Sequence, residues 1–89
     1  MNHYSKIQTK NLNHKLRSLD IDEGIRIESS TKSKKIFVNK NASGTFVVQC
    51  INKNYHDNYN KSIRYVDSAK EILELVKSSF GNKFSVWTY

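Results

Sequence analysis

The apolar positions near the N-terminus follow a helical spacing. Leu12, Leu16 and Leu19 fall at i, i+4 and i+7, which places them on one face of a helix. The spacing predicts a helix that starts at residue 9 or 11 and runs to Leu19. Residues 1–8 have no repeating apolar position, so we expect them to form a loose arm.

A second helix is predicted near the C-terminus by a capping signal and an apolar face. Ser68 and Glu71 have the spacing of a capping box, in which the serine hydroxyl accepts a hydrogen bond from the glutamate N–H. Gly81 supplies the C-terminal stop, because glycine readily adopts the backbone conformation needed there. The residues that share the apolar face are Ala69, Ile72, Leu73, Val76 and Phe80.

Alternation of apolar and polar residues predicts several short strands. Ile25 and Ile27 are separated by Arg26, which is the period of two expected for a strand with one buried face. Residues 41–44 suit a hairpin loop, whereas residues 52–61 have no apolar period and are expected to form a long polar loop. The expected strands are 25–28, 35–39, 45–51, 62–66 and 84–89.

These elements predict an α+β fold with the order α-β-β-β-β-α-β. A chain of 89 residues holds one core, so residues 9–89 are expected to form a single domain after the arm. The simplest packing is a two-layer sandwich, in which an antiparallel sheet of four to five strands carries both helices on one face. The expected core residues are Leu12, Leu16, Ile25, Ile27, Phe46, Val48, Ile72, Leu73 and Val76.

The composition argues against a membrane or secreted protein. The longest apolar runs are a few residues, far short of the roughly 20 residues that a membrane span needs. The first ten residues hold no apolar stretch of signal-peptide length, so no cleaved export signal is expected. Cys50 is the only cysteine and forms no intramolecular disulfide, which is consistent with a cytoplasmic location.

No combination of residues has the spacing of an active site or a metal centre. His3 lies in the arm, His14 on the polar side of the first helix and His56 in the polar loop, so solvated surface histidines are expected. Cys50 shares a strand face with two large apolar residues, which favours a buried, inert thiol. The three glycines are too far apart for a phosphate-binding loop. The sequence therefore predicts no enzymatic activity, no metal and no cofactor.

The positive charge is confined to the first two thirds of the chain. The formal net charge is +7; residues 1–66 hold 12 basic and 5 acidic side chains, while residues 67–89 hold three of each. Such a region attracts polyanions and steers them toward the surface. We expect contacts with phosphate from Lys32, Lys34, Lys35, Lys40, Lys53, Lys61 and Arg64.

Aromatic residues are interleaved with these bases. Tyr55 and Tyr59 are expected to stack on unpaired bases, because exposed rings beside basic groups form a stacking platform. Phe37 and Tyr65 belong to the same interleaved set, although packing against other strand residues also explains them. Three of the 15 basic residues are arginine, the residue best suited to reading guanine edges, so weak sequence selectivity is expected.

Two functions remain open at this point. The first is a small basic, non-enzymatic domain that binds DNA or RNA. The alternative is a small protein-interaction module, an inhibitor or adaptor of viral or mobile-element type, that docks its basic face on an acidic partner. A continuous positive groove with exposed rings favours nucleic acid, whereas an apolar patch beside an open strand edge favours a protein partner.

Overall fold

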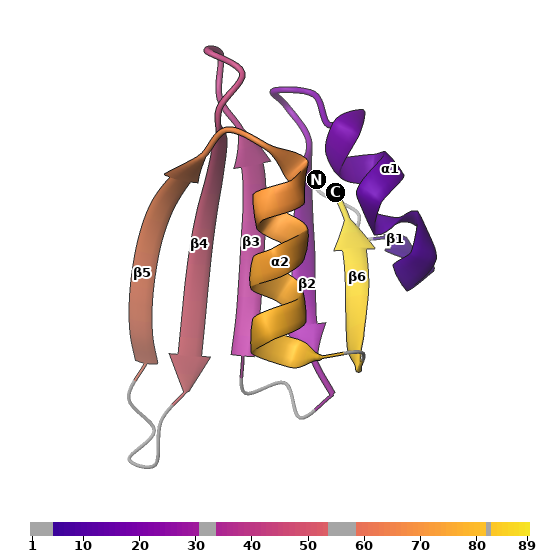
Figure 1. The fold of residues 1–89 in the computed structure, drawn as a ribbon, viewed down its shortest axis with the longest axis vertical. Helices are drawn as coiled ribbons and strands as arrows, with labels where there is room; N and C mark the ends of the chain where they lie inside the picture. The colour runs from indigo at the N-terminus through magenta and orange to yellow at the C-terminus, as the bar shows by residue number, and fades with distance from the viewer. Residues whose placement is uncertain (1–4, 31–33, 54–58, 82) are drawn as a thin grey trace.

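The computed structural model describes residues 5–30, 34–53, 59–81 and 83–89, with the backbone alone at 53, 59 and 60. Figure 1 shows the arrangement of the elements along the chain. In chain order they are β1 (Ser5–Ile7), a 3-10 turn η1 (Thr9–Asn11), α1 (Leu12–Arg17), β2 (Gly24–Ser29), β3 (Lys34–Lys40), β4 (Phe46–Lys53), β5 (Tyr59–Val66), α2 (Ala69–Phe80) and β6 (Phe84–Thr88).

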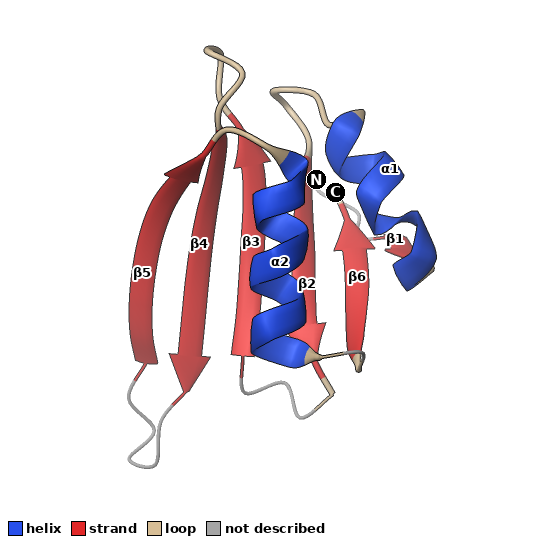
Figure 2. Ribbon diagram, in the orientation of Figure 1, coloured by secondary structure: helices blue, strands red, loops and turns tan. Residues whose placement is uncertain are grey.

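The fold is α+β, with a six-stranded antiparallel sheet and two α-helices (Figure 2). The sheet order is β1-β6-β2-β3-β4-β5. Strands β2 to β5 follow one another as neighbours, and α2 then returns the chain across the sheet so that β6 pairs with β2. The final strand pairs inside the sheet, because β6 lies between β1 and β2.

The strand count and the element order differ from the sequence prediction. The sheet has six strands and not four to five, because Ser5–Ile7 of the expected loose arm forms β1 along β6. This strand places Ile7 opposite Val86, where it packs against the core. A single apolar residue shows no period, so only the long-range pairing reveals this strand.

The expected polar loop of residues 52–61 is also shorter than predicted. Strand β4 continues to Lys53 and β5 begins at Tyr59, with Lys53 opposite Tyr59 in the antiparallel register. Backbone hydrogen bonds between two long strands hold this part of the hairpin, and they do not depend on apolar side chains. Hydrophobic alternation therefore underestimates the length of both strands.

The second helix begins and ends where its capping residues predict. The Ser68 Oγ accepts a hydrogen bond from the Glu71 N–H at 3.3 Å. At the other end Gly81 has φ of 66°, a conformation that favours glycine, and its N–H donates to the Lys77 carbonyl at 2.9 Å. The first helix is shorter than predicted, since residues 9–11 form a 3-10 turn and α1 ends at Arg17.

The core lies between the two helices and one face of the sheet. The apolar core residues take alternate positions of the strands, so Ile25 and Ile27 of β2 lie opposite Val38 and Ile36 of β3. In Figure 1, α2 lies in front of β2 and β3, while α1 lies beside the end of the sheet that holds β6 and β1. The buried residues are Leu12, Leu16, Leu19, Ile25, Ile27, Ile36, Val38, Phe46, Val48, Val66, Ala69, Ile72, Val76 and Val86.

All of the expected core residues are buried except Leu73, which is partly buried against the core. No helix within the described part of the chain is long and apolar enough to cross a membrane.

Candidate nucleic-acid interface

The face of the sheet opposite the helices, called the open face here, is lined by every second residue of each strand. In β2, for example, Arg26 lies between the buried Ile25 and Ile27 and therefore points to the open face. The strand registers align Arg26 with one residue of each of the other five strands, and these six residues form a row across the sheet. The row consists of Lys6, Trp87, Arg26, Phe37, Gln49 and Ile63.

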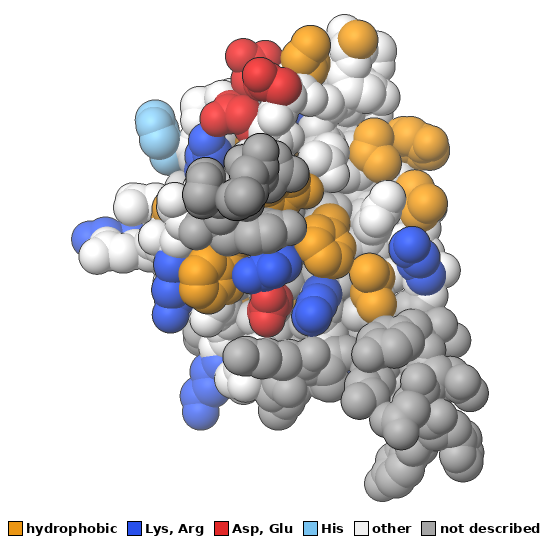
Figure 3. All heavy atoms as spheres, turned by 180° about the vertical axis from the view of Figure 1, so that it is seen from behind, with side chains coloured by type: hydrophobic (Ala, Val, Ile, Leu, Met, Phe, Trp, Pro, Cys, Tyr) orange, Lys and Arg blue, Asp and Glu red, His pale blue; other side chains and the backbone are white. Residues whose placement is uncertain are grey.

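Figure 3 looks onto the open face and shows hydrophobic side chains across it with Lys and Arg side chains among them. A second row beside the first contains Ser85, Glu28, Lys35, Ile51 and Lys61, and a third contains Gly24, Asn39, Val47 and Tyr65. The three rows together carry four basic side chains and one acidic side chain.

Trp87 brings together two cations that are far apart in the sequence. The Lys6 Nζ lies 5.8 Å and the Arg26 Cζ 5.3 Å from the centre of a Trp87 ring, both within the range of cation–π interactions. The Arg26 Nε also lies 2.7 Å from the Glu28 Oε1, and Glu28 is only 8% exposed. Among the described residues of the open face, the one acid is therefore paired with Arg26. Lys35 lies opposite this Glu28 in the register, whereas the register partners of Lys6 and Lys61 are uncharged.

Two apolar side chains of the outermost strand are exposed. Tyr65 is 69% and Ile63 is 55% exposed, and both belong to the open face of β5. Among the described residues, β5 has a hydrogen-bonded neighbour on one side only, β4. The open face therefore ends at a strand edge with an exposed ring.

The lysines and the arginine expected to contact phosphate do not form one surface. Lys35 and Lys61 lie on the open face, where Ile51 is between them in the register. Lys34 and Lys40 lie on the other face of β3, together with the buried Ile36 and Val38. Arg64 of β5 also lies on that face, opposite the buried Val48. The period of two in a strand separates residues that are adjacent in the sequence.

Four of the other expected site residues lie outside the described residues or at the ends of β4 and β5. Lys32 and Tyr55 lie outside the described residues, and at Lys53 and Tyr59 the structure describes only paired backbone at the ends of β4 and β5. Lys40, on the helix side, has its Nζ 5.4 Å from the centre of the Phe46 ring.

Sequence reasoning missed Lys6, Arg26 and Trp87 as members of one surface. The alternation in residues 84–88 did place Trp87 on the strand face away from the buried Val86, which was a local signal for an outward-facing ring. Nothing local connects position 87 with positions 6 and 26, because only the pairing of β6 with β1 and β2 does so.

The C-terminal residue covers a glycine on the same face. Gly24 and Tyr89 exchange two backbone hydrogen bonds of 3.0 Å, and a Cβ added at Gly24 would overlap the Tyr89 ring. The Tyr89 hydroxyl lies 3.4 Å from the Asn39 Oδ1. Glycine is needed here because the ring lies directly against the backbone.

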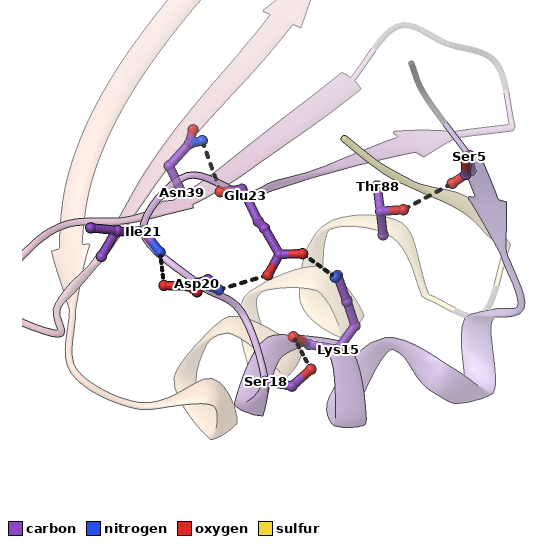
Figure 4. Close-up of polar contacts among 8 residues, drawn as sticks. All are labelled: Ser5, Lys15, Ser18, Asp20, Ile21, Glu23, Asn39 and Thr88. Atoms are coloured by element: carbon purple, nitrogen blue, oxygen red, sulfur yellow. Dashed lines mark hydrogen bonds and ion pairs between the residues drawn. The ribbon is translucent and has the colours of Figure 1, made fainter. Parts of the chain in front are cut away.

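The acidic residues before β2 close the turn that follows α1 (Figure 4). The Glu23 carboxylate accepts from the Lys15 Nζ at 3.0 Å and from the Asp20 N–H at 2.9 Å. The hydrogen bond from Lys15 holds the pKa of the Glu23 carboxyl below its ordinary value of 4.5, and the Asp20 N–H acts in the same direction. The Glu23 carboxylate therefore stabilises the turn between α1 and β2.

The described residues contain no assembled metal-binding cluster. No group of three or more His, Cys, Asp or Glu among them could hold a metal ion. His14 is exposed on α1, while His3 and His56 lie outside the described residues. Cys50 is partly buried and packs against the core opposite Ile36.

Comparisons of the chain with protein-family models, curated proteins and solved structures found no match.

Proposed function

We propose that this chain is a small, non-enzymatic nucleic-acid-binding domain with weak sequence selectivity, and that the open face is its interface. The observation that carries the proposal is the gathering of Lys6, Arg26, Lys35 and Lys61 with the rings of Phe37, Tyr65 and Trp87 on one side of the sheet. The helices pack on the other side of the sheet.

Electrostatics favours a polyanion as the partner. The chain carries a formal net charge of +7, and Glu28, the one acid among the described residues of the open face, is paired with Arg26. Lysines bind phosphate as flexible point charges and do not distinguish one base from another. Three of the four open-face cations are lysines, so the expected contacts position a nucleic-acid backbone and read little sequence.

The proposal is tested by titrating the full chain with fluorescently labelled nucleic acids at several salt concentrations. Trp87 is the only tryptophan and lies on the open face, so its fluorescence is expected to change on binding. Counterion release predicts a log–log slope of affinity against salt of about −0.9 per phosphate contact on duplex DNA, or about −0.7 on a single strand.

A matched pair of double variants separates the open face from the net charge. Lys35→Glu with Lys61→Glu reverses two bases of the open face, whereas Lys70→Glu with Lys77→Glu reverses two exposed bases of α2. Each pair removes four charges, from +7 to +3. We expect the open-face pair to weaken binding about tenfold or more beyond the α2 pair, since only the first pair touches phosphates.

Two outcomes would contradict the proposal. Equal losses in the two double variants would place the interface elsewhere or reduce it to net charge. No binding to any nucleic acid at about 50 mM salt, where nonspecific attraction is strong, would remove nucleic acid as the partner.

A protein partner is the second candidate, and the exposed outer edge of β5 favours it. An unpaired strand edge can accept a further strand, and the exposed Ile63 and Tyr65 would give such a strand apolar contacts. An acidic segment would also match Lys61 on the same strand. This candidate predicts that the chain fails the nucleic-acid titration and that a proline placed at Ile63 disrupts the complex with the protein partner.

A further inference from the structure

The rings of Phe37 and Tyr65 on the open face are too far apart for stacked bases. Phe37 lies on β3 and Tyr65 on β5, two strands away and two residues along. Standard strand spacings put their backbones about 10 Å apart across the sheet and about 7 Å along it, or about 12 Å in all. Bases in a stacked helix are only about 3.4 Å apart along each strand. Neighbouring bases can reach both rings only when they are unstacked.

The cations lie on one side of the rings. Lys35 precedes Phe37 by two residues on β3, and Lys61 precedes Tyr65 by four residues on β5. In the register these two lysines share a row with Ile51 between them, about 10 Å apart. The row beyond Phe37 on the other side contains Asn39 and Val47 but no charged residue among those in register. The side with the two lysines therefore offers cations to phosphates, with Glu28 opposite Lys35 but paired to Arg26, and the row on the other side offers none.

Trp87 has a different part from the other two rings. Its ring already has the Lys6 and Arg26 cations within 6 Å, so it holds these two cations in place on the open face, on the side of β3 away from β5. Phe37 is partly buried and Tyr65 is 69% exposed, and neither has a cation–π partner among the interactions described. The rings of Phe37 and Tyr65 are thus the ones that no described cation occupies.

We infer that the nucleic acid bound by this domain is a single strand, which crosses β3, β4 and β5 with bases on Phe37 and Tyr65 and phosphates beside Lys35 and Lys61. The inference rests on the proposed function and names its substrate class. Base–aromatic stacking tolerates any base, in agreement with weak selectivity. A duplex keeps its bases stacked and paired, so it offers phosphates to the lysines but no base to the rings.

The test compares four probes on the full chain: an oligo-thymidine and an oligo-uridine of about 16 nucleotides, a DNA duplex of that length, and inorganic polyphosphate, which has no bases. We expect both single strands to bind at least tenfold more tightly than the duplex. Tyr65→Ala should weaken single-strand binding about 5- to 140-fold, the range expected for one stacked base. It should leave polyphosphate binding within about twofold of wild type, because no ring contacts a phosphate polymer.

Two variants act as controls for the ring. Tyr65→Phe keeps the stacking surface and should retain binding, while Ile63→Ala removes an exposed apolar side chain of the same strand and face without removing a ring. Both positions are more than half exposed, so the fold should tolerate the changes, and urea unfolding of each variant checks that it does.

Duplex binding as tight as single-strand binding would overturn this inference while leaving the proposed function in place. A loss with Ile63→Ala equal to that with Tyr65→Ala would also overturn it, since an apolar patch and not stacking would then explain the contact. Absence of binding to all nucleic acids would refute the proposed function itself.

Discussion

The orientation of α2 determines how much two neighbouring residues contribute to the free energy of unfolding. Ile72 is fully buried, whereas Leu73 is only partly buried at the edge of the core. Replacement of either residue by alanine removes three carbon atoms from the same helix. Any difference in stability between the two variants therefore reports how deeply each side chain is buried.

The expected magnitudes follow from burial. Each buried methylene contributes about 0.8 kcal/mol, so the three carbons lost in Ile72→Ala account for about 2.4 kcal/mol, and the cavity left behind adds to this. We expect a total of about 3 to 4 kcal/mol. For Leu73→Ala the partly exposed site lets water and neighbours fill the space, and we expect about 1 to 2 kcal/mol.

The assay is urea unfolding, followed by far-ultraviolet circular dichroism and by Trp87 fluorescence. With a slope of about 1 kcal/mol per molar, the midpoint should fall by about 3 to 4 M for Ile72→Ala and by about 1 to 2 M for Leu73→Ala. The chain as a whole is expected to be stable by about 4 to 13 kcal/mol, so Ile72→Ala can approach complete unfolding. Ile72→Val, expected to cost about 0.5 to 1.5 kcal/mol, keeps the measurement within range.

A larger loss for Leu73→Ala than for Ile72→Ala would refute the reasoning. It would mean that α2 is rotated about its axis relative to the sheet and that Leu73, not Ile72, faces the strands.

Three further predictions concern the turn, the glycine and the final strand. Gly24→Ala should lower the free energy of unfolding because the new Cβ overlaps the Tyr89 ring, and adding Tyr89→Ala should recover part of the loss; additive effects in a double-mutant cycle would contradict this contact. Deletion of residues 84–89 should abolish cooperative unfolding, since β6 lies between β1 and β2; an unchanged midpoint by circular dichroism would show that the strand is an appendage. A carboxyl whose pKa is lowered by folding stabilises the fold at pH above its ordinary value, and this contribution is lost as pH falls through the lowered pKa. Glu23→Gln should therefore reduce the fall in the urea midpoint between pH 6 and pH 3, and an identical fall in both proteins would mean that the Lys15 hydrogen bond has no such effect.

The sequence alone predicted the local elements well where side chains repeat with a clear period. The capping residues Ser68 and Gly81 mark both ends of α2, and Ile25 and Ile27 identify the buried face of β2. These signals are local, because a helix or strand turns its side chains with a known period whatever it packs against. The division of strand residues between a core face and an outer face follows from the same periodicity.

The tertiary structure alone decided which outward residues become neighbours. Strand β1 exists because β6 provides an edge for it, and that pairing brings Lys6 to Trp87 across more than 80 positions of the chain. The same kind of pairing brings Lys35 and Lys61 into one row of the open face, with Ile51 between them. Strand order and register depend on hydrogen bonds between distant segments, whereas a sequence pattern records only the face to which each side chain points.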